Sequence, residues 1–92
     1  MRYYRVRWIH EFMDEPLDLY SEVDEDGWEQ RKVEIFRDGR MGYAEATAHS
    51  LSTELSEKVL PSLEEIAADP QFQPSEITQA AFEEVWQRAR SQ

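Results

Sequence analysis

The clearest pattern along the chain is the alternation of apolar and polar residues on either side of Asp38-Gly39. Period-two alternation is typical of a strand with one buried face, and Asp-Gly favours a two-residue type I′ turn. We therefore predict a hairpin with strands at 28–37 and 40–45. The pairing sets Val33, Ile35, Gly42 and Ala44 on one face, and Phe36, Met41 and Tyr43 on the other.

Two further strands are predicted before this hairpin, at 3–10 and 17–24. A three-residue loop at 25–27 joins the second of them to the strand at 28–37, because Gly27 supplies the left-handed residue that such a loop needs. This register pairs Leu17 with Ile35 and Leu19 with Val33.

Two helices are predicted after the strands. Thr78 is a good N-cap for a C-terminal helix at 79–90, and Ser62 with Glu65 forms a capping box for a short helix at 63–68. The longer helix carries an apolar stripe at helical spacing, made of Ala81, Phe82, Val85, Trp86 and Ala89. We expect this stripe to pack on the face that contains Val33 and Ile35.

These elements predict a single α+β domain spanning residues 1–92. An antiparallel sheet of four to five strands has a short helix and a C-terminal helix packed on one face. The fifth strand is either 57–60 or 72–77, an edge strand in the second case because of its proline.

Composition excludes several classes of function. The chain has no Cys, so disulfides, thiolate catalysis and Cys-based zinc sites are ruled out. The formal net charge of −10 argues against direct binding to nucleic acid or to an anionic membrane. No apolar run reaches the length of a membrane span and the start lacks a signal-peptide h-region, so we expect a soluble, cytoplasmic protein.

Three blocks of sequence, DEPLDLYSEVDEDGWEQRKVEIFRDGRMGYA, PSLEEIAADPQF and FEEVW, together resemble a family of small uncharacterised bacterial proteins classed as a domain of unknown function. The resemblance covers nearly the whole chain and is weakest at 47–59. It implies a free-standing bacterial domain, and it implies no activity, cofactor or catalytic residue.

No pattern in the chain predicts a catalytic or metal site. Residues 22–27 imitate the first half of a calcium loop, but Val33 stands where a bidentate Glu must complete the shell. The two histidines, His10 and His49, have no short spacing and no thiols beside them, so a surface role is favoured. We predict no catalytic residue, no bound metal and no cofactor.

The eleven aromatic residues exceed what one face of the sheet can bury. The surplus, including Phe36 and Tyr43, forms either a second, smaller core under the loop at 47–60 or an exposed patch rimmed by acids. An acid-rimmed aromatic patch is typical of a protein-binding surface.

Eight acidic residues fall between positions 11 and 26 with no Lys or Arg among them. We predict that this segment is an electronegative edge that contacts a basic protein partner, with an aromatic anchor beside it. The predicted contact residues are Asp14, Glu15, Asp18, Tyr20, Glu22, Asp24, Asp26 and Trp28. The function expected is that of a non-catalytic binding protein, an inhibitor or immunity-type protein that masks a basic, nucleic-acid-processing partner. The alternative is a small-molecule-binding domain or an enzyme with its site between sheet and loop.

Overall fold

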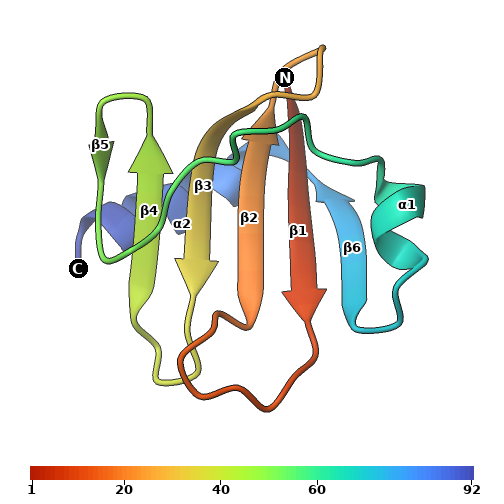
Figure 1. Cartoon of the computed structure of the whole chain (residues 1–92). Coiled ribbons are helices and arrows are strands. Elements are labelled where there is room, and N and C mark those ends of the chain that lie inside the picture. Colours follow the sequence, from red (N-terminus) through yellow and green to blue (C-terminus); the bar gives the residue numbers. More distant parts are fainter.

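Six antiparallel strands form one sheet in the computed structural model, which describes residues 1–92 (Figure 1). The strand order is β5-β4-β3-β2-β1-β6. The strands are β1 (Arg2–Trp8), β2 (Asp18–Val23), β3 (Glu29–Ile35), β4 (Met41–Glu45), β5 (Ala48–His49) and β6 (Phe72–Ile77). The helices are α1 (Leu63–Ala67) and α2 (Gln79–Arg90). The predicted α+β class is confirmed, with more strands than expected.

The additional strands are both at edges of the sheet. β6 is the candidate at 72–77, and it pairs with β1, whereas 57–60 forms no strand. Pro74 lies opposite Val6 in this pair, where its missing N–H is tolerated because no further strand lies beyond β6. β5 lies within the segment that was expected to be loop.

The β3–β4 hairpin differs from the predicted register by one residue. Ile35 pairs with Met41 and Val33 with Tyr43, and the connection is a three-residue loop in which Gly39 has a φ of +91°. Such a loop needs only one residue at positive φ, whereas a type I′ turn would also force Asp38 into that region. The predicted faces of β4 are therefore wrong: Met41 and Tyr43 face α2, and Gly42 and Ala44 face away.

The β2–β3 connection is the predicted three-residue loop at 25–27, with Gly27 at a φ of +90°. The pairing beyond it is not as predicted, because a β-bulge next to Val23 shifts the register by one residue. Asp18 pairs with Ile35 and Tyr20 with Val33, so the expected leucine pairs are wrong. Leu19 points to the face opposite α2.

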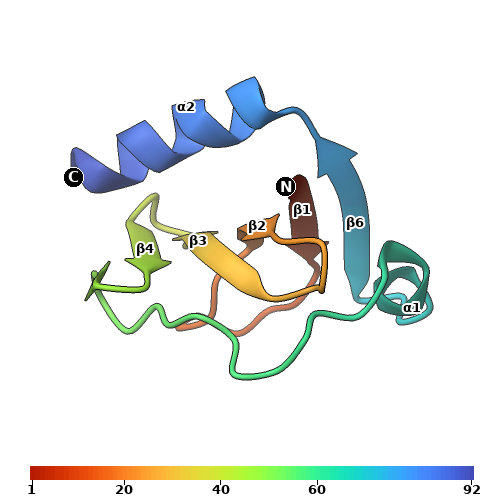
Figure 2. The same cartoon turned by 90° about the horizontal axis from the view of Figure 1, so that it is seen from above.

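The main core lies between α2 and the sheet (Figure 2). Thr78 Oγ1 accepts a hydrogen bond from the Ala81 N–H at 3.1 Å, as its predicted N-cap role requires. Four of the five stripe residues are buried, and Ala81 is exposed at the flank of the stripe. The buried cluster consists of Tyr3, Val33, Met41, Phe82, Val85, Trp86 and Ala89. Neither helix has the length and apolar character that crossing a membrane requires.

The two helices do not share a face of the sheet. Figure 2 shows α2 over one face, whereas the segment leading to α1 crosses the opposite face and α1 itself lies beside β6. Ser62 and Glu65 form the predicted capping box that starts α1. The crossing segment contacts this face of the sheet through polar side chains. Thr53 Oγ1, for example, donates a hydrogen bond to Glu34 Oε1 at 2.7 Å. The second core that was expected there does not contain Met41 or Tyr43.

Candidate functional site

The structure divides the predicted acidic contact residues between two ends of the sheet. β2 is an interior strand, so these residues do not form one sheet edge. Asp14 and Glu15 lie in the β1–β2 loop (residues 9–17), at one end of β2, and Asp26 and Trp28 lie at the turn that follows its other end (Figure 1). The remaining members of the set, Asp18, Tyr20, Glu22 and Asp24, lie on β2 or directly after it.

Asp18 and Tyr20 contact arginines of the neighbouring strand β1. The Asp18 carboxylate lies 3.1 Å from a guanidinium nitrogen of Arg5 and 3.6 Å from one of Arg7. Arg5 also lies over the Tyr20 ring, 5.9 Å from its centroid. Asp18 is only 8 % exposed, so its charge is neutralised inside the protein and is not available to a partner.

Glu22 belongs to an ion-pair network around Arg31. Arg31 donates to both carboxylate oxygens of Glu22, at 2.8 and 2.7 Å, and to both of Glu83, at 2.9 and 2.7 Å. Its guanidinium also lies 4.9 Å from the Phe82 ring centroid and 5.0 Å from that of Trp86. The hydrogen bonds from Arg31 lower the pKa of Glu22 and of Glu83, and those two carboxylates raise the pKa of Arg31. The network joins β2 and β3 to α2 and is structural.

Asp24 organises the β2–β3 turn. Its Oδ1 accepts hydrogen bonds from the backbone N–H groups of Asp26 and Trp28, both at 2.9 Å. Its Oδ2 accepts one from the Gln30 side chain at 3.0 Å. At this end of the sheet, Asp26 is exposed and the Trp28 side chain is 45 % exposed. Asp26 and Trp28 are therefore accessible to a partner, whereas the Asp24 carboxylate is engaged in hydrogen bonds that hold the turn.

The β1–β2 loop is pinned by His10. The Phe12 N–H donates to His10 Nδ1 at 2.9 Å, so the ring proton sits on Nε2, which donates to the Pro16 carbonyl at 2.8 Å. Arg37 donates to the His10 carbonyl at 2.9 Å. The imidazole also packs 4.3 Å from Trp8 and 5.3 Å from Phe12, measured between ring centroids. The loop is therefore held in a defined shape without a strand or helix.

This loop carries both exposed apolar side chains and unpaired carboxylates. Ile9, Phe12 and Met13 are 51 %, 60 % and 72 % exposed. The carboxylates between and after them, Glu11, Asp14 and Glu15, are exposed and belong to none of the ion pairs of the protein. Large apolar side chains exposed together mark an interaction surface more often than a structural one.

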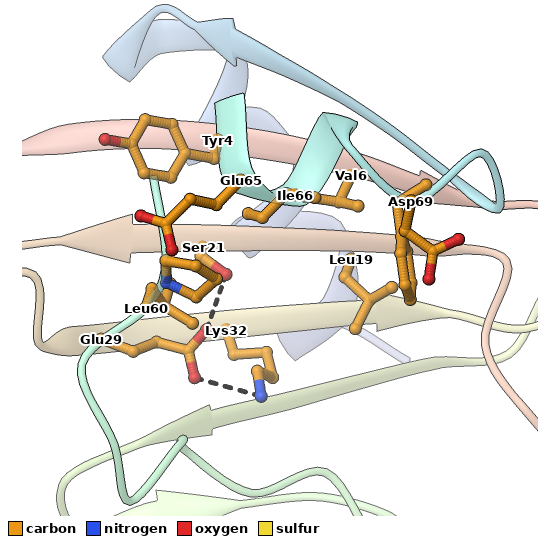
Figure 3. Close-up of a pocket in the computed structure, with 12 residues that line it drawn as sticks. Tyr4, Val6, Leu19, Ser21, Glu29, Lys32, Leu60, Glu65, Ile66 and Asp69 are labelled. Atoms are coloured by element: carbon orange, nitrogen blue, oxygen red, sulfur yellow. Dashed lines mark hydrogen bonds and ion pairs between the residues drawn. The ribbon is translucent and has the colours of Figure 1, made fainter. Parts of the chain in front are cut away.

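A cleft of about 380 Å³ lies on the face opposite α2 (Figure 3). We call it the α1 cleft, because α1 and the segment before it form one side and the sheet forms the other. Its apolar walls come from Val6, Leu19, Leu60, Pro61, Ile66 and Phe72. Phe72 also packs against Trp8, with ring centroids 5.8 Å apart, so the cleft adjoins the aromatic base of the β1–β2 loop.

A buried ion pair lines one part of the cleft. The Glu29 side chain is fully buried and accepts a hydrogen bond from Ser21 Oγ at 2.6 Å and one from the Ser56 N–H at 2.9 Å. Lys32 Nζ lies 3.1 Å from Glu29 and donates to the Glu54 carbonyl at 3.0 Å. The pair is internally neutral and fully hydrogen-bonded, which is what a buried carboxylate requires.

The sequence analysis did not predict two features of the surface, the exposed apolar side chains of the β1–β2 loop and the α1 cleft. Ile9, Phe12 and Met13 were visible as apolar residues interrupting an acidic run, but their exposure depends on the path of the loop. The α1 cleft is built from segments that are distant in the chain, so no local pattern indicates it. No group of three or more His, Asp and Glu side chains is arranged to hold a metal ion.

Comparison with known proteins places the chain in a family. The family model described as Domain of unknown function (DUF6881) matches residues 2–91. No curated protein and no solved structure matches the chain. The matched range includes the β1–β2 loop, the α1 cleft and both helices. Because the match covers nearly the whole chain, the protein belongs to the family described as Domain of unknown function (DUF6881).

Proposed function

We propose that this protein is a non-catalytic binding domain whose β1–β2 loop contacts a basic protein partner. The observation that carries the proposal is the coincidence, on one pinned loop, of three exposed apolar side chains with three unpaired carboxylates. An apolar centre with a charged rim is the usual arrangement of a protein interface. A flat, solvated acidic surface would not need Ile9, Phe12 and Met13 to be exposed.

The loop suits tight binding because it is already ordered. His10 fixes both its ends, so little conformational entropy remains to be lost when a partner docks. Phe12 is the natural anchor, since its ring stacks on the His10 imidazole, which fixes its position, and the residue is still 60 % exposed. Aromatic side chains of this kind carry much of the energy in protein interfaces.

The charge of the whole chain favours a particular kind of partner. A formal net charge of −10 attracts a basic surface and speeds its association. Basic surfaces are typical of proteins that bind or process nucleic acid, because they neutralise phosphates. We therefore favour an inhibitor or immunity-type role, in which this domain covers the basic surface of a nucleic-acid-processing protein.

The proposed interface keeps only part of the contact set expected from the sequence. Asp14 and Glu15 belong to it, and Ile9, Phe12 and Met13 join them. Asp26 and Trp28 form a separate accessible pair at the other end of the sheet, which the same partner reaches only if it spans the length of β2. Asp18, Glu22 and Asp24 are engaged within the fold.

The test uses a partner recovered with this protein from its native host and then purified. We expect Phe12→Ala to weaken its affinity at least about tenfold, the effect of removing an interface anchor. Leu51→Ala is the matched control, because Leu51 is also half exposed but lies beside Gly42 of β4, which β3 and β2 separate from β1. Equal affinities for the parent and Phe12→Ala, in variants with unchanged circular dichroism, would contradict the proposal.

A further inference from the structure

The α1 cleft has the size and lining of a small-ligand site. Its volume of about 380 Å³ falls within the range of roughly 300–1,000 Å³ that is usual for such sites. Figure 3 shows Val6, Leu19 and Ile66 lining the space between the sheet and α1. The cleft is therefore suited to a small ligand with an apolar body.

The charge that the cleft offers to a ligand is negative. Glu65 and Asp69 line it, and neither carboxylate is in an ion pair. In Figure 3, Glu65 lies toward the Tyr4 end and Asp69 beside Leu19 at the other end. Each retains acceptor capacity, since Glu65 receives hydrogen bonds only from Ser62, and Asp69 only from the Gln71 N–H.

The only basic side chain that lines the cleft, Lys32, does not offset the negative charge of Glu65 and Asp69. Lys32 is held by Glu29 and by the Glu54 carbonyl, so its charge is balanced by a carboxylate within 3.1 Å. An anionic ligand would meet Glu65 and Asp69 without a free cation to receive it. A cationic ligand would meet two carboxylates that have no counter-ion.

We infer that the α1 cleft binds an amphipathic cation, an apolar chain or ring that carries one ammonium or guanidinium group. The apolar part lies against Leu19, Ile66 and Phe72, and the positive group lies at Glu65 or Asp69. This chemistry is shared by free organic amines and by the side chains of lysine and arginine on another protein. The inference does not rest on the proposed function, because none of the β1–β2 loop carboxylates lines the cleft.

Three probes with the same body separate the effect of charge from that of the apolar part. These are 4-phenylbutylamine, 4-phenylbutanol and 4-phenylbutanoate, each titrated into the protein while backbone amide shifts are followed by NMR. We expect the amine to shift amides of β1, β2 and α1 around the cleft and to saturate. The carboxylate should bind at least about tenfold more weakly than the amine, since opposite and like charges both act at close range.

Two conservative variants then locate the positive group. Glu65→Gln keeps the capping box of α1, because Gln also serves at that position, and Asp69→Asn keeps an acceptor for Gln71. At least one should weaken amine binding about two- to fivefold, as expected for an exposed ion pair, and leave binding of the alcohol unchanged. Glu84→Gln, on the outer face of α2, is the control and should have no effect.

The outcome distinguishes the sources of the ligand and can overturn the inference. A blocked lysine, Nα-acetyl-lysine-N-methylamide, is added as a fourth probe. If both amines bind, the cleft also accepts lysine side chains of another protein. If only 4-phenylbutylamine binds, the ligand is a free organic amine. Equal affinity for amine and carboxylate, or amide shifts confined to other parts of the sheet, would refute the inference.

Discussion

Replacing Arg31 with Met should destabilise the protein more than most single changes. The substitution removes four hydrogen bonds to Glu22 and Glu83 and leaves the Glu22 carboxylate, whose side chain is 11 % exposed, without a counter-ion. Removing one member of a buried pair costs about 3–5 kcal/mol. Glu83 adds little to this cost, because its side chain is 38 % exposed and solvent screens its pair with Arg31.

The expected loss is therefore about 3–4 kcal/mol at neutral pH, a large part of the roughly 5–15 kcal/mol that is typical of a folded domain. It corresponds to a drop in melting temperature of more than about 12 °C for a domain of this size. Urea unfolding monitored by tryptophan fluorescence measures the loss, since Trp86 is buried beside Arg31.

A double variant separates loss of charge pairing from loss of packing. Glu22→Leu combined with Arg31→Met removes the unpaired charge, so the double variant should recover to within about 1–2 kcal/mol of the parent. The effect of Arg31→Met alone should also shrink as the pH falls, because protonation of Glu22 removes the charge that lacks a partner. An Arg31→Met protein within 1 kcal/mol of the parent, or a double variant no more stable than the single one, would refute this reasoning.

Three further outcomes are expected. Trp86→Ala should lower the free energy of unfolding by about 3–5 kcal/mol in urea titrations, because it empties the centre of the buried cluster. Gly27→Val and Gly39→Val should each lower the free energy of unfolding by more than about 1 kcal/mol in thermal melts, since both positions have positive φ. Gly27→Val should be the more destabilising of the two, because its side chain would clash with Val59. The parent should lose stability as pH falls below about 4.5, because the pKa of Glu22 is lowered in the folded state, and Glu22→Gln should flatten this part of the curve.

Local signals in the sequence were enough to predict most of the elements. Thr78 caps α2, Ser62 and Glu65 form the box that starts α1, and Gly27 holds the positive φ that its loop requires. Each of these features depends on residues within four positions of one another. The existence of an element is therefore readable where its cap or turn chemistry is local.

The registers could not be predicted by the same means. Asp38-Gly39 suits both a two-residue turn and a three-residue loop, and the choice between them reverses the faces of β4. The bulge beside Val23 depends on the fit of β3 against β2, which no single strand reveals. A change of one residue was therefore enough to exchange Gly42 for Met41 on the core face.

The candidate site was predictable only in its overall charge. Composition showed that the protein is strongly acidic, but not which carboxylates are neutralised inside it. The ion pair between Arg31 and Glu83 joins residues 52 positions apart. The carboxylates of Asp18 and Glu22 form ion pairs with arginines of the neighbouring strands. Within the predicted contact set, the accessible acids are Asp14, Glu15 and Asp26, which lie in loops, where no arginine of a neighbouring strand lies opposite them.

The association rate with the purified partner tests the proposed role of the β1–β2 loop most directly. The loop variant carries Glu11→Gln, Asp14→Asn and Glu15→Gln, and the control carries Gln in place of Glu45, Glu57 and Glu84, so each loses three negative charges. Stopped-flow measurement at about 10 mM and 150 mM salt compares steering when the Debye length is about 30 Å and about 8 Å. We expect the loop variant to associate several-fold more slowly than the control at low salt, with the difference narrowing at high salt. Equal association rates for the two variants at low salt would contradict the proposal that this loop receives the partner.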